Sequence, residues 1–310
     1  MKFVFVTALD YLSISQKIEC EVGFNNHLKL TNDTSKISSF IAPYHASCMG
    51  SLEYSHLLSG RPVVYVERDL PSPHDVHDEL VDFLREIQSL LGELWLWHDN
   101  SINCQQAFAL ARNASVVSSN CLPVFNSSAT GEDIDIKITA DEFIDIIRSR
   151  LVQIDSFKES NIPRQTSIRK SIGRLNVALY HLQSARNNRD LGLKIANYCS
   201  FFEALFSTDT AELSHQLSQR ISFFLFDCPE KRLEMYRLTK KAYTVRSKTV
   251  HGDMLDSSVS TLKSIAVHCD EVARGCLMKI FRDQSLFDIF NSHSKEKVSN
   301  YLVEMVFGVN

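Results

Sequence analysis

Short apolar runs alternate with polar turns in the first half of the chain, which is the pattern of a mixed domain. Runs rich in Val, Phe, Tyr and Trp predict four strands, at residues 2–6, 61–68, 93–98 and 106–111. Between the second and third runs, apolar residues recur at helical spacing from Val76 and predict a helix that ends at Gly92. Thr139 and Glu142 have the spacing of a capping box, so a further helix is expected there. We therefore predict an α+β domain for this half.

The hydrophobic period in the second half is helical throughout. The run at residues 191–206 is apolar nearly all round, which is typical of a buried central helix. Asp209 and Glu212 indicate another capping box, and Pro229 and Gly252 bracket a long helix. The expected helices cover about residues 168–182, 191–206, 209–226, 229–251 and 258–281, with a short amphipathic helix at about 295–307. Five consecutive helices with short connections predict an antiparallel, all-α bundle.

The two halves also differ in charge. Residues 1–160 carry 12 Lys and Arg against 22 Asp and Glu, a net charge of −10, whereas residues 161–310 carry 21 against 15, a net charge of +6. The stretch 158–167 is polar, and Pro163 prevents a helix from continuing through it. We therefore expect a mixed domain at residues 1–160 and a helical domain at residues 161–310, with different partners.

Composition points to a soluble globular protein. The chain is 44% hydrophobic and 23% charged, and no apolar run approaches the ~18 residues that a membrane-spanning helix needs. The apolar run at residues 1–9 is short and ends at Asp10, which indicates a strand rather than a signal peptide. None of the eight cysteines forms a CxxC pair, so we expect reduced thiols and a cytoplasmic protein.

Candidate chemistry lies in the segment "YTVRSKTVHGD", where Arg246 and His251 stand five residues apart just before Gly252. Histidine titrates near neutral pH and can take a proton from a 2'-hydroxyl or give one to a leaving 5'-oxygen. A guanidinium stabilises the negative charge that builds on phosphorus between these steps. The pair therefore fits RNA cleavage without a metal. The other interpretation is electrostatic, because Arg and His at a helix end also favour the macrodipole.

The surroundings of this pair are basic and contain one unusual acid. Residues 230–251 hold seven Lys and Arg against two Glu. Four of these cations are candidates for contact with a phosphate backbone, although a solvated helix face would look similar: Lys231, Arg237, Lys241 and Lys248. Glu203 is the only acid within the apolar run at residues 191–206, and a buried carboxylate needs a partner. Arg246 or Arg220 could supply it, or Glu203 could be a structural ion pair or lie at an exposed edge.

Other motifs carry less weight. The segment "HDVHDE" at 74–79 offers possible metal ligands, but its spacing fits no standard site, and acids are common in a first helical turn. Trp95 and Trp97 would point the same way in a strand, where they are candidates for stacking on a base, although a core or interface role is more typical. The chain has no Walker motif, no Gly-rich dinucleotide turn and no Ser or Cys nucleophile motif. We predict neither a metal nor a cofactor.

The region from about 171 to 283 resembles a HEPN domain, and most of all its ApeA-like branch. The resemblance rests on "YCSFFEALFS", "ELSHQLSQRISFFL" and "LTKKAYTVRSKTVHG". The last segment contains the family's Arg-x4-6-His signature as Arg246 and His251, flanked by Tyr243 and Gly252. Ser247 follows the signature arginine, where the family often has Asn, Asp or His.

The resemblance implies a helical bundle that dimerises, so that two signature pairs form one composite, metal-independent ribonuclease site. It makes Arg246 and His251 catalytic. The supporting residues would be Glu203, Arg220, Tyr243 and Ser247. Such proteins serve as toxins and as abortive-infection or anti-phage effectors, so RNA, a second copy and an antitoxin or trigger protein are the expected partners. The alternative is a non-catalytic HEPN module that binds a nucleotide or a protein and mediates dimerisation.

Overall fold

The computed structural model describes residues 1–23, 27–71, 75–112, 114, 116–122, 124–149, 173–209, 212–292 and 294–309. The chain divides into two compact units. The first comprises Met1–Asn126 and Asp133–Arg150, and the second comprises Ser127–Glu132 and Leu151–Asn310. The boundary predicted near residue 160 lies outside the described residues. An α+β region followed by a mostly helical half, as the sequence predicts, is confirmed.

A six-stranded antiparallel sheet forms the centre of the first unit, in the order β3-β4-β5-β1-β6-β7. Three predicted strands are present as β1 (Lys2–Ala8), β5 (Val63–Asp69) and β6 (Ala107–Ala111). The edge strands are β3 (Glu19–Glu21) and β7 (Val117–Asn120), and the short strand β4 (Lys29–Thr31) joins β3 to β5. A separate parallel pair joins β2 (Leu12–Ile14) to β8 (Ile136–Ile138).

Helix α4 (Val76–Trp97) packs its apolar stripe into the same core as one face of the sheet. The predicted strand at 93–98 is wrong, because α4 continues through Gly92 and includes both tryptophans. Leu94 and Trp95 extend the buried stripe, which explains why the helix does not stop at the glycine. Trp95 is 1% exposed and Trp97 is 43% exposed, so the two rings do not share a face as they would in a strand.

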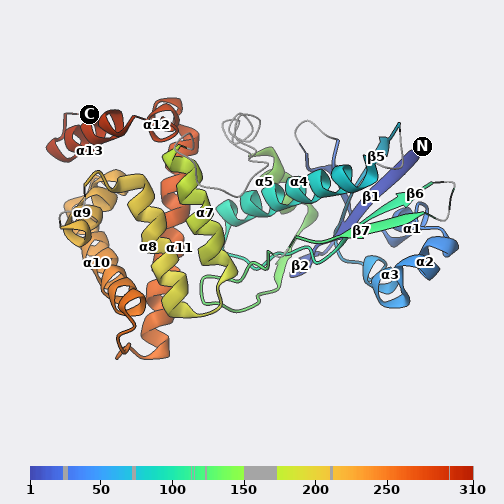
Figure 1. The fold of residues 1–310 in the computed structure, drawn as a ribbon, viewed down its shortest axis with the longest axis horizontal. Helices are drawn as coiled ribbons and strands as arrows, with labels where there is room; N and C mark the ends of the chain where they lie inside the picture. The colour runs from blue at the N-terminus through green and yellow to red at the C-terminus, as the bar shows by residue number, and fades with distance from the viewer. Residues whose placement is uncertain are drawn as a thin grey trace. The chain divides into compact units, whose positions relative to one another are not determined.

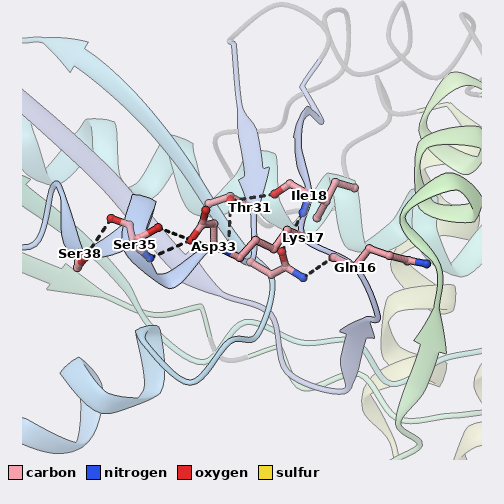
Figure 2. A network of polar contacts seen from close by, with 8 residues as sticks. Gln16, Lys17, Ile18, Thr31, Asp33, Ser35 and Ser38 are labelled. Atoms are coloured by element: carbon pink, nitrogen blue, oxygen red, sulfur yellow. Dashed lines mark hydrogen bonds and ion pairs between the residues drawn. The ribbon is translucent and has the colours of Figure 1, made fainter.

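The other face of the sheet shares a second core with short helices that the sequence pattern did not reveal: α1 (Thr34–Ser38), α2 (Pro43–Met49) and α3 (Ser51–Leu57). Asp33 caps α1 by accepting hydrogen bonds from the amide and hydroxyl of Ser35 (Figure 2). Nearby, the hydroxyl of Thr31 donates to the carbonyl of Ile18. The capping box of Thr139 and Glu142 is confirmed at the start of α5 (Ala140–Arg148).

The second unit is a bundle around α8 (Figure 1). Its helices are α7 (Arg174–Asn187), α8 (Leu191–Phe206), α9 (Leu213–Leu225), α10 (Pro229–His251), α11 (Val259–Arg282), α12 (Gln284–Phe290) and α13 (Lys295–Phe307). Helix α8 packs against α7, α9, α10 and α11, which explains its nearly continuous apolar run. Ile168 and Ile172, assigned to the first helix by pattern, lie outside the described residues.

The helical unit differs from the sequence prediction at the start of α9 and at α12. The capping box of Asp209 and Glu212 is wrong: Glu212 adopts a left-handed conformation and makes no side-chain cap, and Asp209 accepts hydrogen bonds from Gln216 instead. Helix α12 was not predicted, and Asp283 caps it. By contrast, α10 begins at Pro229 and is closed by left-handed Gly252, as expected.

Within the described residues, no helix combines the length and the apolar character needed to span a membrane. All eight cysteines are free thiols in this structure.

Candidate functional site

The centre of the candidate site is a contact between α8 and α10. One carboxylate oxygen of Glu203 lies 3.3 Å from Nη2 of Arg246, and the other lies 3.5 Å from it. Both side chains are partly buried, at 23% and 24% exposure. Tyr243, one turn before Arg246 on α10, donates its hydroxyl to Glu203 and places its ring 5.4 Å from the guanidinium. Glu203 therefore contacts both Arg246 and Tyr243 and fixes their positions relative to each other.

Burial sets the protonation of the groups around Glu203. Burial, and then the Glu203 carboxylate, raise the pKa of Tyr243 to about 12, so its hydroxyl stays protonated and remains a hydrogen-bond donor. Burial also raises the pKa of the Cys199 thiol, which Glu203 raises further, so this cysteine is an inert core residue. On α7, burial lowers the pKa of His181, while the attraction of Glu203 opposes that shift.

Arg220, one of the two candidate partners of Glu203, contacts the end of α8. Its Nη1 donates to the carbonyl of Phe206 at 2.6 Å, at the end of α8. Arg174 donates to the carbonyls of Ala204 and Leu205 at the same helix end. Two arginines therefore satisfy the last carbonyls of α8, where the macrodipole is negative. Among the described residues Arg220 makes no ion pair with Glu203, so Arg246 is the partner of that carboxylate.

His251 lies at the end of α10, and its side chain is exposed. It is five residues beyond Arg246, which corresponds to about 140° around the helix axis. Among the described residues, no hydrogen bond or ion pair joins His251 to Arg246 or to any other group. Ser247, which follows the arginine, is half-buried. The structure thus places a fixed arginine and a free histidine on successive turns, without bringing them into contact.

The predicted basic residues of α10 fall into two groups. Lys231, Arg237 and Lys241 are exposed, and Lys231 lies 5.9 Å above the Phe226 ring. Lys248 is tied to Asp256 by an ion pair of 2.6 Å, which compensates its charge locally. The exposed cations are therefore available to a phosphate chain, whereas Lys248 would first have to leave its acid.

Three exposed apolar residues, which we call the apolar patch, lie close together in sequence around the end of α10. Val250 is 57% exposed, Met254 81% and Val259 65%, all within ten residues of the connection from α10 to α11. Sequence periodicity did not identify this patch, because its members lie in a helix end, a loop and the first residue of the next helix. Apolar side chains grouped beside a candidate site are typical of a surface that another molecule covers.

The described residues contain no cluster of three or more His, Cys, Asp or Glu that could hold a metal ion. His74 of the segment "HDVHDE" lies outside the described residues, and Asp75 and His77 are at the start of α4.

Comparisons of the chain with models of known families, with curated proteins and with solved structures give no match.

Proposed function

We propose that this protein is a metal-independent endoribonuclease of the HEPN type, acting in the cytoplasm as a toxin or anti-phage, abortive-infection effector. The observation that carries the proposal is the half-buried cluster of Glu203, Tyr243 and Arg246, one turn from the exposed His251. A guanidinium that is held in place, with a free imidazole on the next turn of the same helix, provides the two kinds of group that phosphodiester cleavage requires. The bundle of α7 to α13 is compatible with this proposal.

In the proposed reaction the 2'-oxygen of a ribose attacks the adjacent phosphorus, and the bond to the 5'-oxygen breaks. One imidazole accepts the 2'-proton, and a second donates a proton to the leaving 5'-oxygen. Arg246 stabilises the extra negative charge on the phosphoryl oxygens, and its contacts with Glu203 and Tyr243 fix the guanidinium before the substrate binds. The product on the 5' side is a 2',3'-cyclic phosphate.

The second imidazole comes from a second copy of the chain in this proposal. A two-fold axis near the end of α10 would bring two His251 side chains to one groove. The exposed patch of Val250, Met254 and Val259 supports this, because a dimer interface would cover it. The first unit would then sense a trigger or bind an antitoxin. The alternative is a dimeric, non-catalytic module, favoured by the fact that Arg246 is paired with Glu203 rather than with His251.

Product chemistry tests the proposal directly. Purified protein should cleave RNA in the presence of EDTA and leave a 2',3'-cyclic phosphate or 3'-phosphate, because no step uses a metal. End-group analysis by mass spectrometry would identify the product. Products with 3'-hydroxyl ends, or cleavage that stops in EDTA, would contradict the mechanism. Binding of a nucleotide without any cleavage would favour the non-catalytic module.

Salt dependence tests the basic face of α10. Lys241→Ala should weaken RNA binding and make the plot of log affinity against log salt shallower by about 0.7, the value for one contact with a single strand. Lys248→Ala is the matched control, because Asp256 already compensates that charge and its slope should change less. Titrations at several salt concentrations measure both slopes. If the salt dependence of RNA affinity has the same slope for the wild type and for Lys241→Ala, Lys241 does not contact the RNA.

A further inference from the structure

Residues 127–132, "SSATGE", form a segment that we call the strap. In sequence the strap lies between β7 and β8, yet it belongs to the helical unit, whereas Asn126 and Asp133 on either side belong to the first unit. Ser127, Ser128, Ala129 and Gly131 are all buried. The strap is closed on itself, because the amide of Ser128 donates to the carbonyl of Glu132 and the amide of Gly131 donates to the carbonyl of Ser128.

One end of the strap binds the turn between α7 and α8. The amide of Ser127 donates to the carbonyl of Arg186 at 2.8 Å, and its hydroxyl lies 2.9 Å from the carbonyls of both Arg186 and Asn188. These carbonyls belong to the last turn of α7 and to its C-cap, Asn188, where carbonyls need partners outside the helix. The turn is thus held by backbone and side-chain bonds from a distant part of the sequence.

The other end of the strap is fixed by close packing and by charge. Gly131 has a φ of +79°, and a β-carbon at this position would lie 2.5 Å from the carbonyl oxygen of Arg189. Only glycine fits both the left-handed backbone and this approach. Glu132 forms an ion pair of 2.6 Å with Lys263, in the second turn of α11. The strap therefore joins the α7–α8 turn to the start of α11.

The elements that the strap holds are the neighbours of the end of α10. Asp190 caps α8, and Gly192 in the first turn is so close that a β-carbon would lie 3.0 Å from Thr249 Oγ1 and 3.2 Å from Leu255. Thr249 and Leu255 flank His251 in sequence. Helix α11 begins just beyond the same connection, with Ser258 as its cap. The end of α10 that bears His251 is therefore packed against the start of α8 and covalently joined to the start of α11, and the strap holds both of these elements.

We propose that Ser127 and Gly131 are positioning residues, which hold the α10 end bearing His251 through the α7–α8 turn. This inference rests on the proposed function where it concerns cleavage, and on packing alone where it concerns the order of the α10 end. A displaced strap would release the turn, and with it the support of Thr249.

Gly131→Ala tests the inference, with Gly308→Ala as the matched control. Both glycines have positive φ in the helical unit, but nothing lies within 4 Å of a β-carbon at Gly308. A β-carbon at Gly131 would clash with the carbonyl oxygen of Arg189 and push the strap away from the α7–α8 turn, so Gly131→Ala should speed amide exchange at Gly252 and Asp253 by about tenfold or more. These amides bond to Thr249 and Lys248 in the wild type. Gly308→Ala should leave their exchange unchanged.

Ser127→Ala is the second variant, in case Gly131→Ala does not fold. It removes only the hydroxyl bonds to the α7–α8 turn, and it should speed exchange at the same amides by a smaller factor. In cleavage assays both variants should lower kcat and leave KM for RNA unchanged. Wild-type exchange at Gly252 and Asp253 in a folded Gly131→Ala or Ser127→Ala variant would overturn the inference. If the wild type does not cleave RNA, the proposed function fails, while the exchange result still decides whether the strap acts.

Discussion

The His251→Ala variant is expected to cleave RNA about 10²–10⁴ times more slowly than the wild type, the usual contribution of a positioned acid or base. His251 is exposed and makes no hydrogen bond to the residues that the structure describes, so its loss removes no contact that holds the fold. The fold should therefore be unaffected, and circular dichroism and thermal unfolding should match those of the wild type. Initial cleavage rates on a labelled RNA in EDTA measure the effect.

His215→Ala is the matched control for this prediction. His215 is also an exposed histidine of the helical unit, but it bonds to the hydroxyl of Tyr236 and lies outside the cluster around Glu203. Its replacement should leave the cleavage rate within a few-fold of the wild type. A His251→Ala protein that cleaves at the wild-type rate would show that this histidine transfers no proton. If both folded variants lost the same fraction of the cleavage rate, the effect would not be specific to His251.

The arginine of the pair is constrained in a way that the histidine is not. Glu203 contacts Nη2 of Arg246, and the Nε of that arginine has no hydrogen-bond partner among the described residues. Because that Nε is buried, a phosphate that approaches the guanidinium would use the Nη donors that Glu203 leaves open, without displacing the carboxylate. The ion pair therefore orients the arginine and does not occupy it. This is the physical reason for treating Glu203 as a supporting residue and not as a competing ligand.

Local signals in the sequence predicted what depends on local structure. The capping box at Thr139 and the bracket of Pro229 and Gly252 were confirmed, because each acts within one or two helical turns. The partner of Glu203 was among those expected, because a single acid in an apolar run must find a cation nearby. The same kind of signal failed at Glu212, where the chain turns left-handed before α9 begins.

Tertiary packing decided the features that the sequence did not reveal. The apolar run around Trp95 is equally consistent with a short strand and with a buried helix, and its packing beside the sheet favours the helix. Helices α1 to α3 are too short for periodicity to appear. The sequence of the strap has no periodic pattern of apolar residues. Its role as part of the helical unit depends on Gly131 and Ser127 meeting carbonyls that lie some sixty residues further along the chain.

Dimerisation is expected to be essential for cleavage, because one protomer supplies one copy of His251 and the proposed reaction transfers two protons. Met254→Asp places a charge in the exposed apolar patch, so it should shift the protein from dimer to monomer at micromolar concentration and abolish cleavage. Leu233→Asp is the matched control, since Leu233 is 50% exposed but lies near the opposite end of α10. Sedimentation and cleavage rates, measured on the same samples, report both effects.

Mixed dimers test whether the two pairs act in one site. Arg246→Ala and His251→Ala homodimers should each be inactive, because each lacks both copies of one group. A heterodimer of the two variants keeps one arginine and one histidine, and it should remain far below the wild type if both imidazoles transfer protons in one step. Recovery of about half the wild-type rate would mean that a single arginine and a single histidine suffice. A wild-type protein that is strictly monomeric and still cleaves RNA would contradict the composite site altogether, since no second imidazole would then meet His251 across an axis.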